Sequence, residues 1–124
     1  MTRIYVAGAY SADNVIDVLG NMRRGIQIAA EILLAGYAPF APWLDYQFSL
    51  TDAGADLTVE DYYRYSLAWL DVSDAVVIVP ESQYSKGVRM EIERAGSLSI
   101  PVYSWEVFRK IMLDKSVEKG EVES

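Results

Sequence analysis

AVVIVPESQYSKGVRMEIERA, residues 75–95, is the stretch of the chain that decides its fold. The run Ala75–Val79 is rich in β-branched residues and predicts a buried strand. A short polar loop follows, and from Ser85 the apolar residues recur at helical spacing, with Gly87 near the helix start. In open α/β sheets, ligands bind beyond the carboxyl ends of the strands, where such loops run into helix N-termini. This stretch therefore predicts a strand, loop and helix unit with a ligand site at its loop.

Glu91 lies on the packed face of the predicted helix. Val88 and Ala95 belong to its apolar stripe, and Glu91 lies three residues after the first and four before the second, so it points the same way. A carboxylate on a packed face needs a partner or a function, because burying an unpaired charge is costly. A purely structural explanation stays open, because the helix dipole favours acidic residues in first turns.

The composition restricts the chemistry. The chain has 124 residues, of which 52% are hydrophobic, and this predicts a single domain with a substantial core. A net charge of −7 argues against binding to a nucleic acid polymer or to an anionic membrane. Without cysteine or histidine, carboxylates, hydroxyls and phenols must carry any catalysis, and we expect no cofactor and no metal. No apolar run has membrane-spanning length and no signal peptide is recognised, so we expect a soluble, cytoplasmic protein.

The spacing of apolar residues predicts strands that alternate with helices. The predicted strands are residues 3–8, 37–40, 75–79 and 100–103, and the predicted helices are residues 15–35, 59–72, 85–95 and 104–113. This alternation predicts an α/β fold with a flavodoxin- or Rossmann-like, doubly wound parallel sheet of about four to five strands in the order 2-1-3-4. Residues 1–113 would form this single domain, and we expect the charged tail 114–124 to fray.

The predicted strand order places two loops at one crevice, between the first and third strands. The loop Gly8–Asn14 faces the loop Glu81–Gly87 there, and Glu91 lies beside them. Gly8, Tyr10 and Ser11 are candidates to contact a ligand, because small residues after a strand allow close approach to the backbone. Neither loop has the spacing of a P-loop or of a GxGxxG fingerprint, so the sequence does not indicate ATP or NAD.

Two further segments flank this crevice. The long loop 41–57 carries Trp43, Tyr46 and Phe48, which either form an apolar wall for a planar ligand or close the core or a subunit contact. Thr58 and Asp61 resemble a capping box at the start of the helix 59–72. On its inward face Ser66 is the small polar residue among bulky apolar ones, and a hydrogen bond within its own helix would explain it.

Three segments resemble the nucleoside 2-deoxyribosyltransferase superfamily, which includes deoxynucleoside 5'-monophosphate N-glycosidases. They are IYVAGAYS at 4–11, SLAWLDVSDAVVIV at 66–79 and SKGVRMEIERA at 85–95, supported by SIPVYSWEVF at 99–108. The resemblance implies cleavage or transfer at the N-glycosidic bond of a nucleotide or nucleoside, without a cofactor. It also implies a homodimer or larger assembly, because active sites in this family are often completed by a neighbouring subunit.

The resemblance also assigns roles to individual residues. It implies that Glu91 is the nucleophile and that Tyr5 orients it. Glu91 suits this role at neutral pH if the helix N-terminus and the Tyr5 hydroxyl keep it ionised. Ser85 and Gly87 would hold a 5'-phosphate. LDYQF at 44–48 is similar to a base-binding segment of the family, and the base-binding glutamine would be Gln47.

The chain departs from the family at Ser66, where a catalytic aspartate is common. Three interpretations follow: another acid such as Asp45 protonates the leaving base, the substrate leaves with less help, or the domain binds nucleotides without catalysis. A different α/β enzyme acting on a nucleotide or sugar phosphate is a further alternative, because this fold supports many chemistries.

Overall fold

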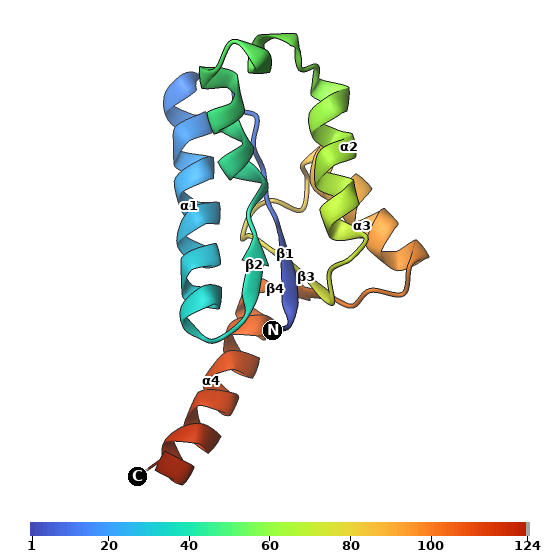
Figure 1. The fold of residues 1–124 in the computed structure, drawn as a ribbon. Helices are drawn as coiled ribbons and strands as arrows, with labels where there is room; N and C mark the ends of the chain where they lie inside the picture. The colour runs from blue at the N-terminus through green and yellow to red at the C-terminus, as the bar shows by residue number, and fades with distance from the viewer. Residues whose placement is uncertain (124) are drawn as a thin grey trace.

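All four strands of the protein are parallel and follow the order β2-β1-β3-β4, which confirms the predicted fold class. The computed structural model describes the backbone of residues 1–123 and the side chains of residues 1–115 (Figure 1). In chain order the elements are β1 (Arg3–Ala7), α1 (Val15–Leu34), β2 (Ala38–Phe40), the 3-10 helices η1 (Pro42–Leu50) and η2 (Ala53–Asp56), α2 (Val59–Leu70), β3 (Ala75–Ile78), α3 (Lys86–Ser97), β4 (Val102–Ser104) and α4 (Trp105–Glu123).

The alternation of residues along β1 divides the core between the two faces of the sheet. Ile4 and Val6 pack with α1 and α4, whereas Tyr5 and Ala7 pack with α2 and α3. Figure 1 shows α1 on one side of the sheet and α2 and α3 on the other. Tyr5 pairs in register with Phe40 of β2 and Val76 of β3, so its side chain leaves the middle of the sheet toward α2 and α3.

Side-chain caps fix the starts of the helices beside the crevice. The predicted capping box is confirmed: the Asp61 amide donates to Thr58 Oγ1 at 3.2 Å, and the Thr58 amide donates to the Asp61 carboxylate at 2.8 Å. Ser85 caps α3, because its hydroxyl oxygen accepts a hydrogen bond from the Val88 amide at 3.4 Å. Thr58 lies in the connection from β2 to α2, and Ser85 lies in the connection from β3 to α3. Both connections start at the carboxyl end of a strand.

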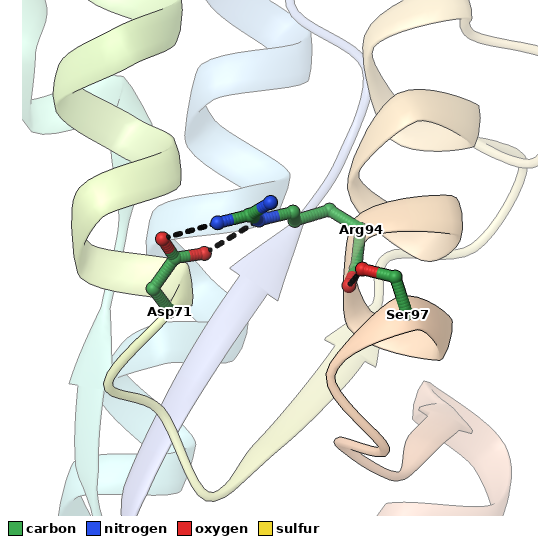
Figure 2. Close-up of polar contacts among 3 residues, drawn as sticks. All are labelled: Asp71, Arg94 and Ser97. Atoms are coloured by element: carbon green, nitrogen blue, oxygen red, sulfur yellow. Dashed lines mark hydrogen bonds and ion pairs between the residues drawn. The ribbon is translucent and has the colours of Figure 1, made fainter.

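An ion pair joins the C-terminal ends of α2 and α3. Arg94 Nε donates to Asp71 Oδ1 at 2.8 Å, and Arg94 Nη2 donates to Asp71 Oδ2 at 2.7 Å (Figure 2). These hydrogen bonds from Arg94 lower the pKa of Asp71. Both side chains are substantially exposed, so the pair contributes little to stability.

Some predicted boundaries differ from the structure. β4 begins at Val102, because Pro101 has no amide hydrogen and the Ile100 amide donates to Ala95 at the end of α3. The loop 41–57 contains two 3-10 helices, and α4 continues to Glu123, past the predicted end at residue 113. The fraying of residues 114–124 and the domain boundary at residue 113 stay predictions. None of the helices within residues 1–123 is long and apolar enough to span a membrane.

Candidate functional site

A cavity of about 590 Å³ lies at the carboxyl ends of β1 and β3. The β1–α1 loop, η1, α2 and the start of α3 all contribute to its lining. Ligands of α/β sheets bind at this end of the strands, where the strand order changes direction. The predicted crevice is therefore a real cavity in the structure, with a volume in the range of small-molecule sites.

Nine of the ten residues predicted for the site line this cavity. They are Tyr5, Gly8, Tyr10, Ser11, Asp45, Ser66, Ser85, Gly87 and Glu91. Gln47 is exposed and does not line it. Gln47 follows Asp45 by two residues on η1, and a 3-10 helix has three residues per turn, so the two side chains point in different directions. The structure thus brings nine of the ten candidate residues together around one cavity.

Tyr5 and Glu91 meet at the sheet end of the cavity. Tyr5 is completely buried, and its hydroxyl oxygen has no hydrogen-bond partner of good geometry. Burial is the main reason that the pKa of Tyr5 is raised, and the nearby Glu91 carboxylate adds to the shift, whereas Ser66 opposes it. Tyr5 therefore stays protonated and is able to donate a hydrogen bond to Glu91 or to a ligand.

Glu91 is less acidic than an ordinary glutamate. Burial raises the pKa of Glu91 to about 7, and the Tyr5 hydroxyl opposes this shift without cancelling it. The loss of solvation thus outweighs the effect of the Tyr5 hydroxyl on the pKa of Glu91. Near pH 7 a substantial fraction of Glu91 carries a proton.

Asp45 also lines the cavity with a carboxyl group, and tyrosines lie near it. Burial raises the pKa of Asp45 to about 6. The pKa of Tyr10 is raised first by burial and then by Asp45, Tyr46 and Tyr62, so these side chains lie near one another. Asp45 therefore adds a second, partly buried carboxyl group to the cavity, near Tyr10 and also near enough to Tyr5 to raise its pKa.

Trp43 is the packing anchor of η1, and its slot is formed by two glycines. A Cβ atom placed on Gly8 or on Gly25 would lie 2.5 Å from the Trp43 ring, which is closer than real contacts allow. The indole Nε1 donates to the Ala9 carbonyl at 3.2 Å, and Trp43 is only 1% exposed. Gly8 therefore admits the indole as well as lining the cavity, and Trp43 both closes the core and forms part of the cavity wall.

Ser82 ties together the two loops that flank the crevice. Its hydroxyl oxygen accepts a hydrogen bond from the Ala9 amide at 2.9 Å, and its side chain is buried. The preceding residue, Glu81, has a φ of 64°, a left-handed conformation that turns the chain sharply after β3. This contact fixes the β1–α1 loop against the β3–α3 loop.

Replacing Ser82 with Ala should lower the free energy of unfolding by about 1–3 kcal/mol, because the Ala9 amide loses its acceptor. Urea denaturation measures this loss. Ser97→Ala is the matched control, because Ser97 is exposed and its hydroxyl only donates to the Arg94 carbonyl on its own helix. Equal losses in the two variants would contradict this account of the loop contact.

The sequence analysis did not assign several residues that line the cavity. Tyr62 and Tyr63 of α2 precede Ser66 by four and three residues, so one helical face carries all three. Met90 follows Lys86 by four residues on α3 in the same way. The helical spacing already predicted Tyr62 and Tyr63 on the inward face with Ser66. Lys86 and Met90 lie five residues and one residue before Glu91, so helical spacing from Glu91 did not indicate them.

The aromatic residues of the loop 41–57 take different places. Tyr46 lines the cavity, as expected if the aromatic residues of this loop form a wall for a planar ligand. Phe48 does not line it and packs edge-on against Tyr65, at a ring-centroid distance of 5.7 Å. Tyr65 and Trp69 also pack on Phe40, so Phe48 belongs to an aromatic cluster outside the cavity.

The fold is similar to that of the 2-deoxyribosyltransferase from the psychrotolerant bacterium Bacillus psychrosaccharolyticus. The TM-score is 0.58 at 16% sequence identity, over 83% of this chain and 71% of that enzyme's chain. At this identity the similarity shows a shared fold. No curated protein matches the chain in sequence. The model of the family described as "Domain of unknown function (DUF7768)" matches residues 2–105, which include all four strands and every residue that lines the cavity, and the chain belongs to this family.

Proposed function

We propose that the protein cleaves or transfers at the N-glycosidic bond of a (deoxy)nucleoside 5'-monophosphate or nucleoside, with Glu91 as the nucleophile. The observation that carries this proposal is the partly buried Glu91 carboxyl beside the buried Tyr5 hydroxyl, in an aromatic-lined cavity. The shared fold with a 2-deoxyribosyltransferase is consistent with it.

Glu91 would act on the anomeric carbon of the sugar. Breaking the N-glycosidic bond creates positive charge at that carbon, and an adjacent carboxylate stabilises the charge or forms a covalent bond with the carbon. Tyr5 would donate a hydrogen bond that holds the reactive oxygen of Glu91 in place. Attack by water then gives hydrolysis, and attack by a second base gives transfer.

The start of α3 would bind the 5'-phosphate. The amides of the first helical turn have no partner within the helix, and the helix dipole favours an anion there. Ser85, Lys86 and Gly87 all line the cavity at this point. The Ser85 hydroxyl oxygen accepts from the Val88 amide, and its hydrogen is available for a phosphate oxygen.

The tyrosines around Asp45 would bind the base. Tyr10, Tyr46 and Tyr62 line the cavity near Asp45, whereas Tyr63 lies near Gly87, and aromatic rings stack favourably on a planar heterocycle. With the phosphate at α3 and the sugar at Glu91, the base would extend toward these rings. Gly8 and Ser11 would contact the substrate from the β1–α1 loop.

Lys86 supplies a test of the phosphate site. Lys86→Gln should raise KM for a 5'-monophosphate by about tenfold or more, because a hydrogen bond to a charged group is worth about 1.5–3 kcal/mol. KM for the matching nucleoside should stay the same. The control is Arg89→Gln, because Arg89 is exposed on the same helix and does not line the cavity. Equal effects on nucleotide and nucleoside would argue against phosphate binding at α3.

The test of the reaction itself is chromatography of the protein incubated with nucleosides and with ribo- and deoxynucleoside 5'-monophosphates, with and without an acceptor base. The expected result is release or exchange of base that disappears in Glu91→Ala. Release that persists in Glu91→Ala would contradict the proposal.

A second candidate function is nucleotide binding without catalysis. Ser66 favours it, because this buried residue lines the cavity near Tyr5 and brings no carboxyl group to it. Nucleotides that raise the melting temperature while no base is released would support this alternative.

The proposal includes a cytoplasmic location, where nucleotides are available, and a homodimer or larger assembly. Phe48, Tyr65 and Trp69 are partly exposed on one side of the molecule, and such apolar surface is suited to a subunit contact. Light scattering during size-exclusion chromatography measures the assembly, and a monomer at all concentrations would exclude it.

A further inference from the structure

Among the side chains of residues 1–115, two carboxyl groups line the cavity, those of Glu91 and Asp45. If Glu91 attacks the sugar, the leaving base still needs a proton, because a base that departs as an anion is a poor leaving group. Ser66 is not acidic enough to supply one. Asp45 is the carboxyl group that remains for this task.

The position of Asp45 is set by its anchored neighbour. Trp43, two residues earlier on η1, is held in the slot of Gly8 and Gly25 and by its hydrogen bond to the Ala9 carbonyl. The side chain of Asp45 is only partly exposed, lines the cavity and lies near Tyr10, where the base is expected, and near Tyr5, which contacts Glu91. A side chain carried by such a rigid support is suited to directional proton transfer.

Other polar groups of the cavity are less suited to donate a proton. The pKa values of Tyr5 and Tyr10 are both raised above that of an ordinary phenol, mainly by burial, so these groups are weaker acids than usual. Lys86 lies at the start of α3, where the phosphate is expected. Burial raises the pKa of Asp45 to about 6, so part of its population is protonated near neutral pH.

We propose that Asp45 is the general acid that protonates the leaving base. The Asp45 carboxyl proton passes to a ring nitrogen of the base as the bond between that base and the anomeric carbon breaks, and the electron pair of this bond stays with the base. A Glu91 oxygen forms the new bond to the anomeric carbon. In hydrolysis, the Asp45 carboxylate then takes a proton from the attacking water, whose oxygen displaces Glu91 and restores both groups. This inference rests on the proposed function.

The test compares two leaving groups in Asp45→Asn. One substrate is a purine nucleotide that the protein cleaves, and the other is its N7-methylated form, whose base carries a positive charge and leaves without an added proton. Asp45→Asn should slow release of the ordinary base by about 10²–10⁴-fold, the usual contribution of a general acid. Release of the methylated base, corrected for its spontaneous loss, should fall by much less.

The matched control is Asp52→Asn. Asp52 lies in the same long loop, is exposed and does not line the cavity, so both release rates should be unchanged. Equal losses on both substrates in Asp45→Asn would overturn the inference and indicate a binding role. No release of either base by the unsubstituted protein would overturn the proposed function and the inference with it.

The pH profile gives a second readout. The titratable groups that line the cavity with Asp45 are Tyr5, Tyr10, Tyr46, Tyr62, Tyr63, Lys86 and Glu91. Glu91 must be ionised and Asp45 protonated, so kcat/KM should be bell-shaped, with apparent pKa values near 6 and 7 that belong to the pair. Asp45→Asn should lose the descending limb and keep the rise through about pH 7 that belongs to Glu91. An unchanged bell in this variant would overturn the inference.

Discussion

Glu91→Gln will abolish base release and will make the protein more stable than the unsubstituted chain above pH 7. The first effect follows because a glutamine cannot act as a carboxylate nucleophile. The second follows because burial raises the pKa of Glu91 from 4.5 to about 7, which means that ionising Glu91 costs more in the folded state than in the unfolded state.

The direction of the pH dependence can be stated from these values. Below about pH 4.5 Glu91 is protonated in both states, and its ionisation costs no stability. Between about pH 4.5 and 7 the folded state holds the proton more tightly, so the free energy of unfolding falls as the pH rises. Well above pH 7 the loss is complete and amounts to at most roughly 3–4 kcal/mol, since one pKa unit corresponds to about 1.36 kcal/mol.

Urea denaturation from pH 4 to pH 8.5 measures this dependence. The difference between Glu91→Gln and the unsubstituted chain should be small at pH 4 and should grow toward pH 8. Glu93→Gln is the control, because Glu93 is exposed on the same helix and should leave the pH dependence as it is. A pH-independent difference for Glu91→Gln would contradict the raised pKa.

Trp43→Ala should reduce the free energy of unfolding by about 3–5 kcal/mol, the usual cost of truncating a large buried aromatic residue. Trp43 is 1% exposed and fills the space between Gly8 and Gly25, and its truncation also leaves the Ala9 carbonyl without the indole hydrogen bond. Since this anchor holds η1 over the cavity, nucleotide binding should weaken as well.

Trp69→Ala provides the comparison, because Trp69 is 47% exposed and stacks on Phe40 outside the cavity. Urea denaturation should show a clearly smaller loss for this variant, and nucleotide binding should be retained. Equal losses for the two tryptophans would contradict the anchoring role of Trp43.

The strand order and the face of Glu91 could be predicted from the sequence because both depend on local patterns. β-branched runs and helical spacing gave β1, β3, α1 and α3, and short connections between them restrict the topology. The capping box of Thr58 and Asp61 is likewise a local signal, and the structure contains it.

The arrangement of residues 41–57 could not be predicted because it depends on contacts between distant parts of the chain. The slot for Trp43 requires two glycines from other elements. A Cβ atom on Gly54 would lie 1.7 Å from the Phe48 carbonyl oxygen, so the close approach of η1 and η2 requires this glycine. No periodic pattern in the sequence predicts that contact. The orientation of Gln47 away from the cavity follows from the 3-10 geometry, which the sequence pattern did not reveal.

The raised pKa of Glu91 also could not be predicted from the sequence. Nine of the residues that line the cavity could be named, but the balance between burial and the Tyr5 hydroxyl at Glu91 depends on how deeply the carboxyl is placed. That balance decides at which pH the site can react.

The most direct test of the central claim is mass spectrometry of the protein after incubation with a 2'-fluorinated nucleotide. The fluorine slows breakdown of a glycosyl intermediate, because it destabilises positive charge at the anomeric carbon. The proposed mechanism predicts a mass increase of one glycosyl phosphate unit, located by peptide mapping on Glu91 and absent from Glu91→Gln. A sugar attached to a different residue, or base release by the protein with no adduct on Glu91, would contradict Glu91 as the nucleophile.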